Sequence, residues 1–293
     1  MNRIAATFAL LTLFWLSLSP ALAQSFSRAR TLTEEFDLTA SFSGRSDLTS
    51  RGVDAGDFAV ASFGGGVRTF RPIASGGRGL VFGLEWTEHQ LDASAAAALP
   101  DQLREVRTVL GLNYPIGERW SARAYIWPGL YGDFENVSAR DFNAPALLLA
   151  SYKVSSELNW SFGLRVDAFS DNPVIPIVGV RWAFAPAWTF NVGLPRTGFF
   201  YDVNERLAVR FGVSLLGGSY HVSDAVAPGL QRTLLDYREF RVGLGAAYRL
   251  GENLNLDLEV GSSLDRRFDY HERGVKLEGE NAGFVSLGLN GKF

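Results

Sequence analysis

Residues 253–260 alternate strictly between polar and apolar side chains and read Asn253-Leu254-Asn255-Leu256-Asp257-Leu258-Glu259-Val260. Successive side chains of an extended strand point to opposite faces, so the four aliphatic side chains share one face and the four polar ones share the other. A helix would repeat every 3.6 residues instead of every two. This stretch therefore predicts a β-strand with one apolar and one polar face.

The same alternation recurs along most of the chain. It is clearest in four further stretches: 35–42, 158–167, 207–215 and 239–249. The composition agrees, since 31 glycines and 22 phenylalanines stand beside only 11 prolines, as expected for strands joined by turns. The chain has no cysteine, so disulfides cannot stabilise it. These features predict an all-β protein.

The lengths of the strands and of their connections favour a membrane barrel over a soluble sheet. The strands run for about 10–14 residues, whereas strands of globular sheets usually have 5–6. Short connections fall at 117–119, 155–157, 186, 204–206 and 251–252. Long, more charged ones fall at 45–56, 92–104, 135–143, 221–235 and 269–280. Short turns at one rim and long loops at the other are typical of outer-membrane barrels, so we expect an antiparallel transmembrane β-barrel.

The number of strands should be even, because both ends of such a barrel face the periplasm. Fourteen segments alternate: 34–44, 57–70, 79–91, 105–116, 120–134, 144–154, 158–169, 175–185, 188–194, 198–203, 207–220, 235–250, 253–267 and 282–293. The segments 188–194 and 198–203 are short for crossing a bilayer. We therefore expect them to form a hairpin around Pro195-Arg196-Thr197 that bends into the lumen. The prediction is 12–14 strands, with 12 preferred.

The N-terminus of the chain carries an export signal. Arg3, the apolar run 4–18 and the small residues of Ala21-Leu22-Ala23 form a signal peptide over 1–23, with cleavage expected before Gln24. Residues 24–33 would be a periplasmic segment and 34–293 the barrel. We expect the mature protein in the outer membrane of a Gram-negative bacterium.

The chain stops at Phe293, and Leu289 and Leu287 lie on the same face of the last segment. This pattern resembles the terminal strand that the outer-membrane assembly machinery recognises. Gly291 departs from it, since an aromatic residue is more usual there. Five aromatic residues close to short turns are expected to form a girdle at the periplasmic rim: Tyr114, Trp120, Trp160, Trp188 and Tyr248.

Placing the apolar faces outward puts a charged set of side chains inside the barrel. Its members are Glu85, Arg107, Arg123, Arg165, Asp167, Arg181, Arg210, Glu239, Arg241, Arg249, Asp257 and Glu259. A charge on the lipid side would cost roughly 2–4 kcal/mol near the midplane, so these groups should face the lumen. Two interpretations stay open. The arginines could line a narrow water-filled pore for small anionic solutes, or ion pairs could fill the lumen and close it.

Catalytic and cofactor sites are not indicated. The three histidines, His89, His221 and His271, lie at strand ends or in long loops, and only His221, near Ser223 and Asp224, suggests a nucleophile and base. No spacing indicates a metal site, a phosphate-binding loop or a dinucleotide fingerprint. The net charge of −3 suggests no nucleic-acid partner. We therefore expect neither an enzyme nor a cofactor.

Two local patterns bear on the lumen. The stretch 92–99 has a helical composition that ends at Pro100, and it could fold into the barrel mouth or form an exposed loop helix. Gly64-Gly65-Gly66 lies within a strand, where it should bend the strand or leave room in the lumen.

Three short motifs carry a resemblance to a known family. They are the turn Asn204-Glu205-Arg206, the preceding Leu194-Pro195 with 200–203 (Phe-Tyr-Asp-Val), and the terminal phenylalanine strand. With them the chain resembles a family of exported bacterial outer-membrane β-barrels of unknown function, and more loosely the barrel transporters associated with phenol degradation. The resemblance implies a barrel in the outer membrane and transfers no functional residues.

The sequence thus favours a porin-like passive channel for small solutes. The alternative is a closed structural or adhesive barrel that acts through its long loops. Expected partners are outer-membrane lipid, lipopolysaccharide and the barrel assembly machinery, while the oligomeric state stays open.

Overall fold

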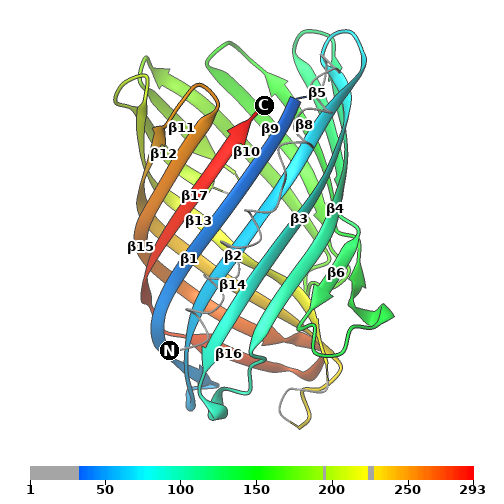
Figure 1. The fold of residues 1–293 in the computed structure, drawn as a ribbon, viewed down its shortest axis with the longest axis vertical. Helices are drawn as coiled ribbons and strands as arrows, with labels where there is room; N and C mark the ends of the chain where they lie inside the picture. The colour runs from blue at the N-terminus through cyan, green and yellow to red at the C-terminus, as the bar shows by residue number, and fades with distance from the viewer. Residues whose placement is uncertain (1–32, 194–195, 224–227) are drawn as a thin grey trace, which may run out of the picture. The chain divides into compact units, whose positions relative to one another are not determined.

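A computed structural model describes residues 33–193, 196–223 and 228–293 of the chain. The expected signal peptide and nearly all of the expected periplasmic segment 24–33 lie outside the described residues. The described part forms a closed, all-β antiparallel barrel of 14 strands (Figure 1). Period-two alternation produces this architecture, since it gives every strand an apolar outer face and a more polar inner face.

The strands of the first half are β1 (Thr33–Ser50), β2 (Val53–Ala74), β3 (Arg78–Ala93), β4 (Gln102–Ile116), β5 (Trp120–Ile126), β6 (Gly129–Gly132), β7 (Phe142–Asn143), β8 (Ala146–Lys153) and β9 (Leu158–Val166). Those of the second half are β10 (Val174–Ala185), β11 (Trp188–Val192), β12 (Arg196–Asp202), β13 (Leu207–Val222), β14 (Thr233–Arg249), β15 (Leu254–Tyr270), β16 (Val275–Gly279) and β17 (Ala282–Lys292). In the described part of the chain, three single-turn 3₁₀ helices lie in the loops: η2 (Ala95–Ala97), η3 (Ala139–Asp141) and η4 (His271–Arg273). Within the described ranges, no helix is long and apolar enough to cross a bilayer.

Each wall strand pairs with its neighbours in chain order, and β17 pairs with β1 to close the ring, for example at Phe42 and Val285. β5 and β6 form one wall strand that is interrupted at Trp127-Pro128, and both pair with β4. β7 and β8 form the next wall strand, in which β7 pairs with β6 and β8 pairs with β5. β16 and β17 likewise form one wall strand beside β15. Closure leaves no free edge where all strands are present, which removes the main aggregation hazard of a sheet.

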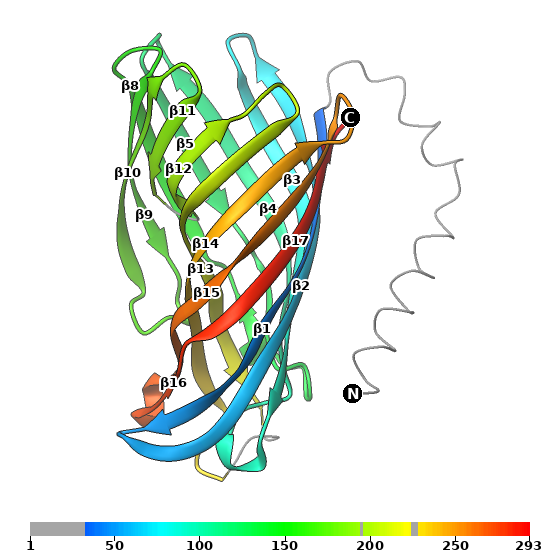
Figure 2. The same ribbon diagram turned by 90° about the vertical axis from the view of Figure 1, so that its left-hand side faces the viewer.

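The preference for 12 strands was wrong, because the short hairpin is part of the wall. β11 pairs with β10, with Asn191 opposite Arg181, and β12 pairs with β13, with Phe200 opposite Arg210. The hairpin therefore does not bend into the lumen (Figure 2). Its strands are short because they occupy only part of the wall's height. The sequence prediction assumed that every wall strand is long enough to cross the bilayer.

The expected loop 45–56 was also wrong. β1 and β2 continue through it as a paired hairpin that turns at Arg51-Gly52, where both residues have positive φ. Register shifts between Ser43 and Ser46 and between Asp47 and Thr49 break the alternation that identifies strands in a sequence.

The two ends of the barrel differ. We call the end with the short turns the turn rim; β1 begins there and Phe293 ends there, and the main chains of Glu34 and Phe293 hydrogen-bond to each other. We call the opposite end the loop end. The five aromatic residues expected to form a girdle lie on exposed outer faces at the turn rim.

A steric constraint explains why a glycine occupies position 291 at the turn rim. Its strand partner is Phe36, and a Cβ atom on Gly291 would lie 2.4 Å from the Phe36 ring. That ring instead stacks on Phe293, with the centroids 5.5 Å apart. The aromatic side chain that is usual at this point of the terminal strand is thus supplied by the neighbouring strand.

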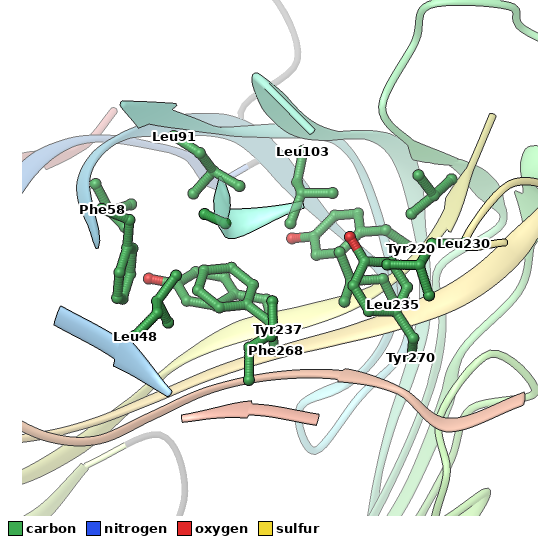
Figure 3. Packing of buried hydrophobic residues seen from close by; sticks show 14 of the residues in the cluster. Leu48, Phe58, Leu91, Leu103, Tyr220, Leu230, Leu235, Tyr237, Phe268 and Tyr270 are labelled. Atoms are coloured by element: carbon green, nitrogen blue, oxygen red, sulfur yellow. The ribbon is translucent and has the colours of Figure 1, made fainter. Parts of the chain in front are cut away.

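An apolar core fills the loop end. β6 stays paired with β4, and on its other edge Gly132 pairs with His221 of β13, so that β1, β2, β3, β4, β6, β13, β14, β15 and β16 close a smaller ring there. Inside this ring lies a buried cluster (Figure 3) that includes Leu48, Phe58, Leu91, Leu103, Tyr131, Tyr220, Leu235, Tyr237, Phe268 and Tyr270. The residues expected to form a helix over 92–99 contain only η2, whose Ala97 is fully buried in this cluster.

Candidate functional site: the barrel interior

The inner face of β2, β3 and β4 carries a compact charge cluster. Glu85 is buried and accepts hydrogen bonds from Arg107 Nε at 2.7 Å and from Arg68 Nε at 2.5 Å. Arg107 also pairs with Glu105 at 2.8 Å. Gly66 makes room for this cluster, since a Cβ atom there would lie 2.8 Å from Glu85 Cγ. The glycine run thus provides clearance in the lumen, as its position in a strand indicates.

A second cluster, centred on Glu239, is more deeply buried. Glu239 accepts hydrogen bonds from Arg241 Nε at 2.7 Å, from Ser43 Oγ at 2.6 Å and from Tyr237 Oη at 2.8 Å. Arg266, fully buried, lies 3.4 Å away on the other side and also bonds to Ser46. A buried carboxylate is tolerated only when such partners replace its lost hydration. This cluster lies directly beside the apolar core, because Arg266 stacks over Phe58.

A third cluster lines β12, β13 and β15. Arg210 donates to both oxygens of Asp257, at 2.6 and 2.7 Å, and to Glu259 at 2.7 Å. Arg196 lies 3.7 Å from Glu259 and 3.9 Å from Asp257. Two arginines therefore balance two carboxylates, with the fork-shaped contacts that guanidinium groups favour.

A fourth cluster fixes the end of β9. Arg165 pairs with Asp167 at 2.7 Å, and the buried Asp167 also accepts a hydrogen bond from Asn143 at 2.8 Å. The main-chain N–H of Phe169 donates to the same carboxylate at 3.1 Å. Asp167 thus organises the loop that follows β9.

Three of the arginines expected inside are different. Arg123, Arg181 and Arg249 are exposed, and their side chains have no hydrogen bond or ion pair with any residue of the described ranges. Arg123 lies opposite Asn113, which lines an interior cavity, and Arg181 lies opposite Asn159 and Asn191. Unpaired guanidinium groups in such places require water around them.

The interior cavity lies on the side of β1–β5 and β8 and has a volume of about 450 Å³. Its lining mixes aromatic, aliphatic and polar side chains: Glu35, Arg68, Thr69, Phe70, Val81, Val109, Asn113, Tyr125, Trp127 and Leu147. Tyr125 and Trp127 stack with their centroids 5.7 Å apart, and Tyr125 donates a hydrogen bond to Asn113. A cavity of this size and character suits a small amphipathic molecule.

The histidines do not form a catalytic group in the described part. His221 Nδ1 lies 2.7 Å from Asp141, and the main-chain N–H of Ser223 donates to Asp133. Asp224, the third member of the weak candidate set, lies outside the described residues. His89 is buried and hydrogen-bonds to Ser62. No group of three or more metal-ligating side chains occurs among the residues that were described.

Several interior residues were missed by the sequence reasoning, namely Arg68, Arg196, Arg266 and Ser43. Arg68 follows the glycine run, which hides the alternation of β2. Its neighbour Val67 is exposed on the outer face, so Arg68 faces inward. Arg266 follows Asp265, whose φ of 46° marks a bulge that shifts the inward face by one residue. No local signal identifies Ser43, whose partner Glu239 is 196 residues away.

Comparisons with known proteins agree with the architecture. A family described as a domain of unknown function, DUF6268, matches residues 79–282. No curated protein sequence matches the chain. The fold is similar to that of the COG4313 outer membrane channel from Pseudomonas putida F1, with a TM-score of 0.51, 14% identity, and 90% of this chain and 96% of that chain covered.

Two further solved structures are more distantly similar. The NanC porin gives a TM-score of 0.43 at 10% identity, with 88% of this chain and 100% of that chain covered. A mutant of the TodX monoaromatic hydrocarbon channel gives 0.43 at 9% identity, with 89% and 90% covered.

Proposed function

The chain belongs to the DUF6268 family, a domain of unknown function, and we propose from its barrel interior that it is an outer-membrane channel for small solutes. The outer face supports the location. Large apolar side chains are exposed all around the barrel, among them Leu84, Val106, Leu148, Phe162, Val178, Leu244, Leu258 and Leu287. Such a surface is unfavourable in water, at roughly 25 cal/mol per Å², and favourable against lipid.

The similar fold of an outer membrane channel from Pseudomonas putida F1 and the export signals at 1–23 support the same location. The expected assembly signal at Phe293, Leu289 and Leu287 is part of this proposal. Leu287 and Phe293 are exposed at or just after β17, where a partner of the assembly machinery could reach them.

The observation that carries the channel is the set of unpaired arginines. A barrel that only needs a filled interior pairs its charges, as the clusters around Glu85, Glu239 and Arg210 do. Arg123, Arg181 and Arg249 instead require water beside them. Together with the cavity of about 450 Å³, they indicate a water-containing chamber in the half of the barrel near the turn rim. The three arginines outweigh Asp37, an inner carboxylate of β1 that also has no ion pair in the described ranges, so the net unpaired charge is positive and favours anionic solutes.

The closed-barrel alternative has its own observation. The apolar cluster fills the loop end, so a straight path along the barrel axis is blocked there. A purely structural or adhesive barrel would have this feature, but it would have no need for hydrated, unpaired arginines. We therefore favour a channel whose solute path avoids the filled end or opens it.

Conductance separates the two functions. Purified protein in planar lipid bilayers should give discrete current steps with a preference for anions. Folding is checked by gel migration, because a folded barrel migrates differently before and after boiling. Folded protein that gives no current above the lipid background would overturn the channel.

A further inference from the structure

The barrel wall has an interruption between β10 and β13. Residues 174–179 of β10 pair with β9, but among the described residues no strand pairs with their other edge, because β11 reaches only to the level of Val180. On the far side, β12 pairs with β13 no further than Ser214. Within the ranges that the structure describes, residues 215–220 of β13 therefore lack a strand partner on that edge too, until His221 meets Gly132 of β6.

Unpaired strand edges are expensive inside a membrane. In hydrocarbon each unsatisfied backbone group costs several kcal/mol, so barrels close fully and irregular backbone occurs only beside protein or water. The interruption begins within the apolar outer belt, since Val178 and Leu215 on its two sides are exposed outward. It is therefore a place where the wall must be covered or must open onto something other than lipid.

The loop 167–173 covers it. The loop joins β9 to β10, yet it reaches past β13 to Asp236 on β14, whose carboxylate accepts hydrogen bonds from the main-chain N–H of Asp171 at 2.9 Å and from Ser170 Oγ at 3.4 Å. Phe169 packs against the apolar cluster, as does Leu216 of β13. At its base the loop is held by Asp167. Three side-chain and main-chain bonds thus close a seven-residue bridge over the interruption.

The lining of the interruption is apolar on both sides of the wall. Ile175 and Ile177 point inward on β10, while Val174 and Val178 point outward on the same strand. On β13, Leu216 points inward and Leu215 points outward. Inside, Leu147 belongs to the cavity and lies on β8, two strands from β10. A small apolar molecule would find favourable contacts with these two edges, and on its way from Leu147 to Ile175 it would pass Arg165 of β9, which lies opposite both and is held by Asp167.

We propose that the interruption between β10 and β13 is a lateral passage for small apolar solutes between the chamber and the bilayer, closed by the loop 167–173 as a lid that is latched on Asp236. The proposal rests on the chamber of the proposed channel and adds to its ion path a second route, taken by apolar solutes. It also accounts for the filled loop end, because a solute that leaves sideways does not need an open axis.

The latch is tested with one substitution and a matched control. Asp236→Ala removes the acceptor of both lid bonds, and losing hydrogen bonds to a carboxylate should raise the share of open lids roughly tenfold. Asp269→Ala is the control, since Asp269 lies directly opposite Asp236 on β15 and has no contact with the lid among the described residues. The readout is uptake of N-phenyl-1-naphthylamine by cells with an intact lipopolysaccharide leaflet. Uptake should rise with Asp236→Ala and stay at the wild-type rate with Asp269→Ala.

An engineered disulfide between the lid and β14 allows the lid to be closed and reopened in the same protein. The chain has no cysteine, so the pair Ser170→Cys and Asp236→Cys can be oxidised without competing thiols. Oxidation should lower uptake to that of cells without the barrel, and reduction should restore it. Cells that stay resistant to large hydrophilic antibiotics throughout show that the outer membrane itself is intact.

Planar-bilayer conductance of the same variants separates the two proposals. Uptake that responds neither to the disulfide nor to Asp236→Ala, in variants that still conduct, would overturn the lateral passage and leave the channel standing. Absence of both current and uptake in folded protein would overturn both.

Discussion

At the scale of single residues, the inner charges divide into two classes with different roles. Glu239 has five partners that replace water: Arg241, Arg266, Ser43, Ser263 and Tyr237. Two of them, Arg241 and Arg266, are themselves buried cations. Arg123 has none among the described residues. The first class stabilises the closed end, and the second requires a hydrated chamber.

Glu239→Ala should therefore be among the most destabilising single changes. It would leave Arg241 and Arg266 buried without their carboxylate, and breaking a buried pair in this way costs about 3–5 kcal/mol. The free energy of unfolding is measured by urea titration of the protein folded in detergent micelles. Glu278→Ala is the matched control, since Glu278 is exposed and lies 3.5 Å from Lys276 and 3.7 Å from Arg267, so that these pairs should contribute less than about 1 kcal/mol. Equal effects of the two substitutions would contradict the distinction.

The sequence does not predict which inner charges are paired and which are unpaired. Alternation alone places Arg165 and Arg181 alike, because it reports a face and not a neighbour. The structure pairs Arg165 with Asp167, two residues further along the chain at the start of the loop after β9, and leaves Arg181 between two asparagines. Such differences depend on cross-strand register, and register is set by turns and bulges far from the residue concerned.

At the scale of elements, a row of glycines shapes the inner wall. Gly198, Gly212, Gly243 and Gly261 lie opposite one another across β12, β13, β14 and β15, and the row ends at Phe284 of β17. The Phe284 ring occupies the space, since Cβ atoms on Gly243 and Gly261 would lie 3.0 and 2.9 Å from it. The short hairpin is thereby fitted closely to its neighbours as part of the wall.

Gly212→Val tests this fit. A Cβ atom at Gly212 would lie 2.3 Å from the carbonyl oxygen of Thr197, so β12 and β13 would have to separate. Overpacking of this kind costs typically about 1–3 kcal/mol. The midpoint of thermal loss of the folded gel band should fall. Gly251→Ala is the control, because a Cβ atom there meets nothing within 4 Å, and it should leave the midpoint unchanged. A Gly212→Val protein as stable as the control would mean that β12 does not belong to the wall.

The strands also show how much of this fold can be predicted from the sequence. Each of the fourteen segments that alternate overlaps a wall strand in the part of the chain that the structure describes. Their count failed at β11 and β12 because strand length was compared with the thickness of a bilayer, although a wall can be interrupted above a short hairpin. The continuation of β1 and β2 through 45–56 was hidden by bulges. The core at the loop end could not be foreseen, since it gathers Leu48, Tyr131 and Tyr270 from distant parts of the chain.

At the scale of the whole barrel, the two ends carry out different tasks. The loop end has an apolar core and buried ion pairs, and so it resembles the interior of a soluble domain. The half near the turn rim holds the cavity and the exposed arginines. A solute path that uses this half should be sensitive to its unpaired charges and insensitive to charges outside it.

The double substitution Arg123→Glu and Arg181→Glu should therefore turn the preference of the channel from anions towards cations. A unit charge contributes about 1 kcal/mol at 4 Å in water, roughly fivefold in ion occupancy, and its reversal doubles that free energy. The reversal potential under a salt gradient measures the change. Arg206→Glu is the control, because Arg206 lies in the turn before β13 and forms no ion pair with any described residue. Since neither Arg123 nor Arg181 has a partner to lose in the described ranges, the double variant should keep its thermal midpoint. A selectivity that stays anionic in this folded variant would mean that permeating ions do not pass these arginines, and the chamber would then lie off the conducting path.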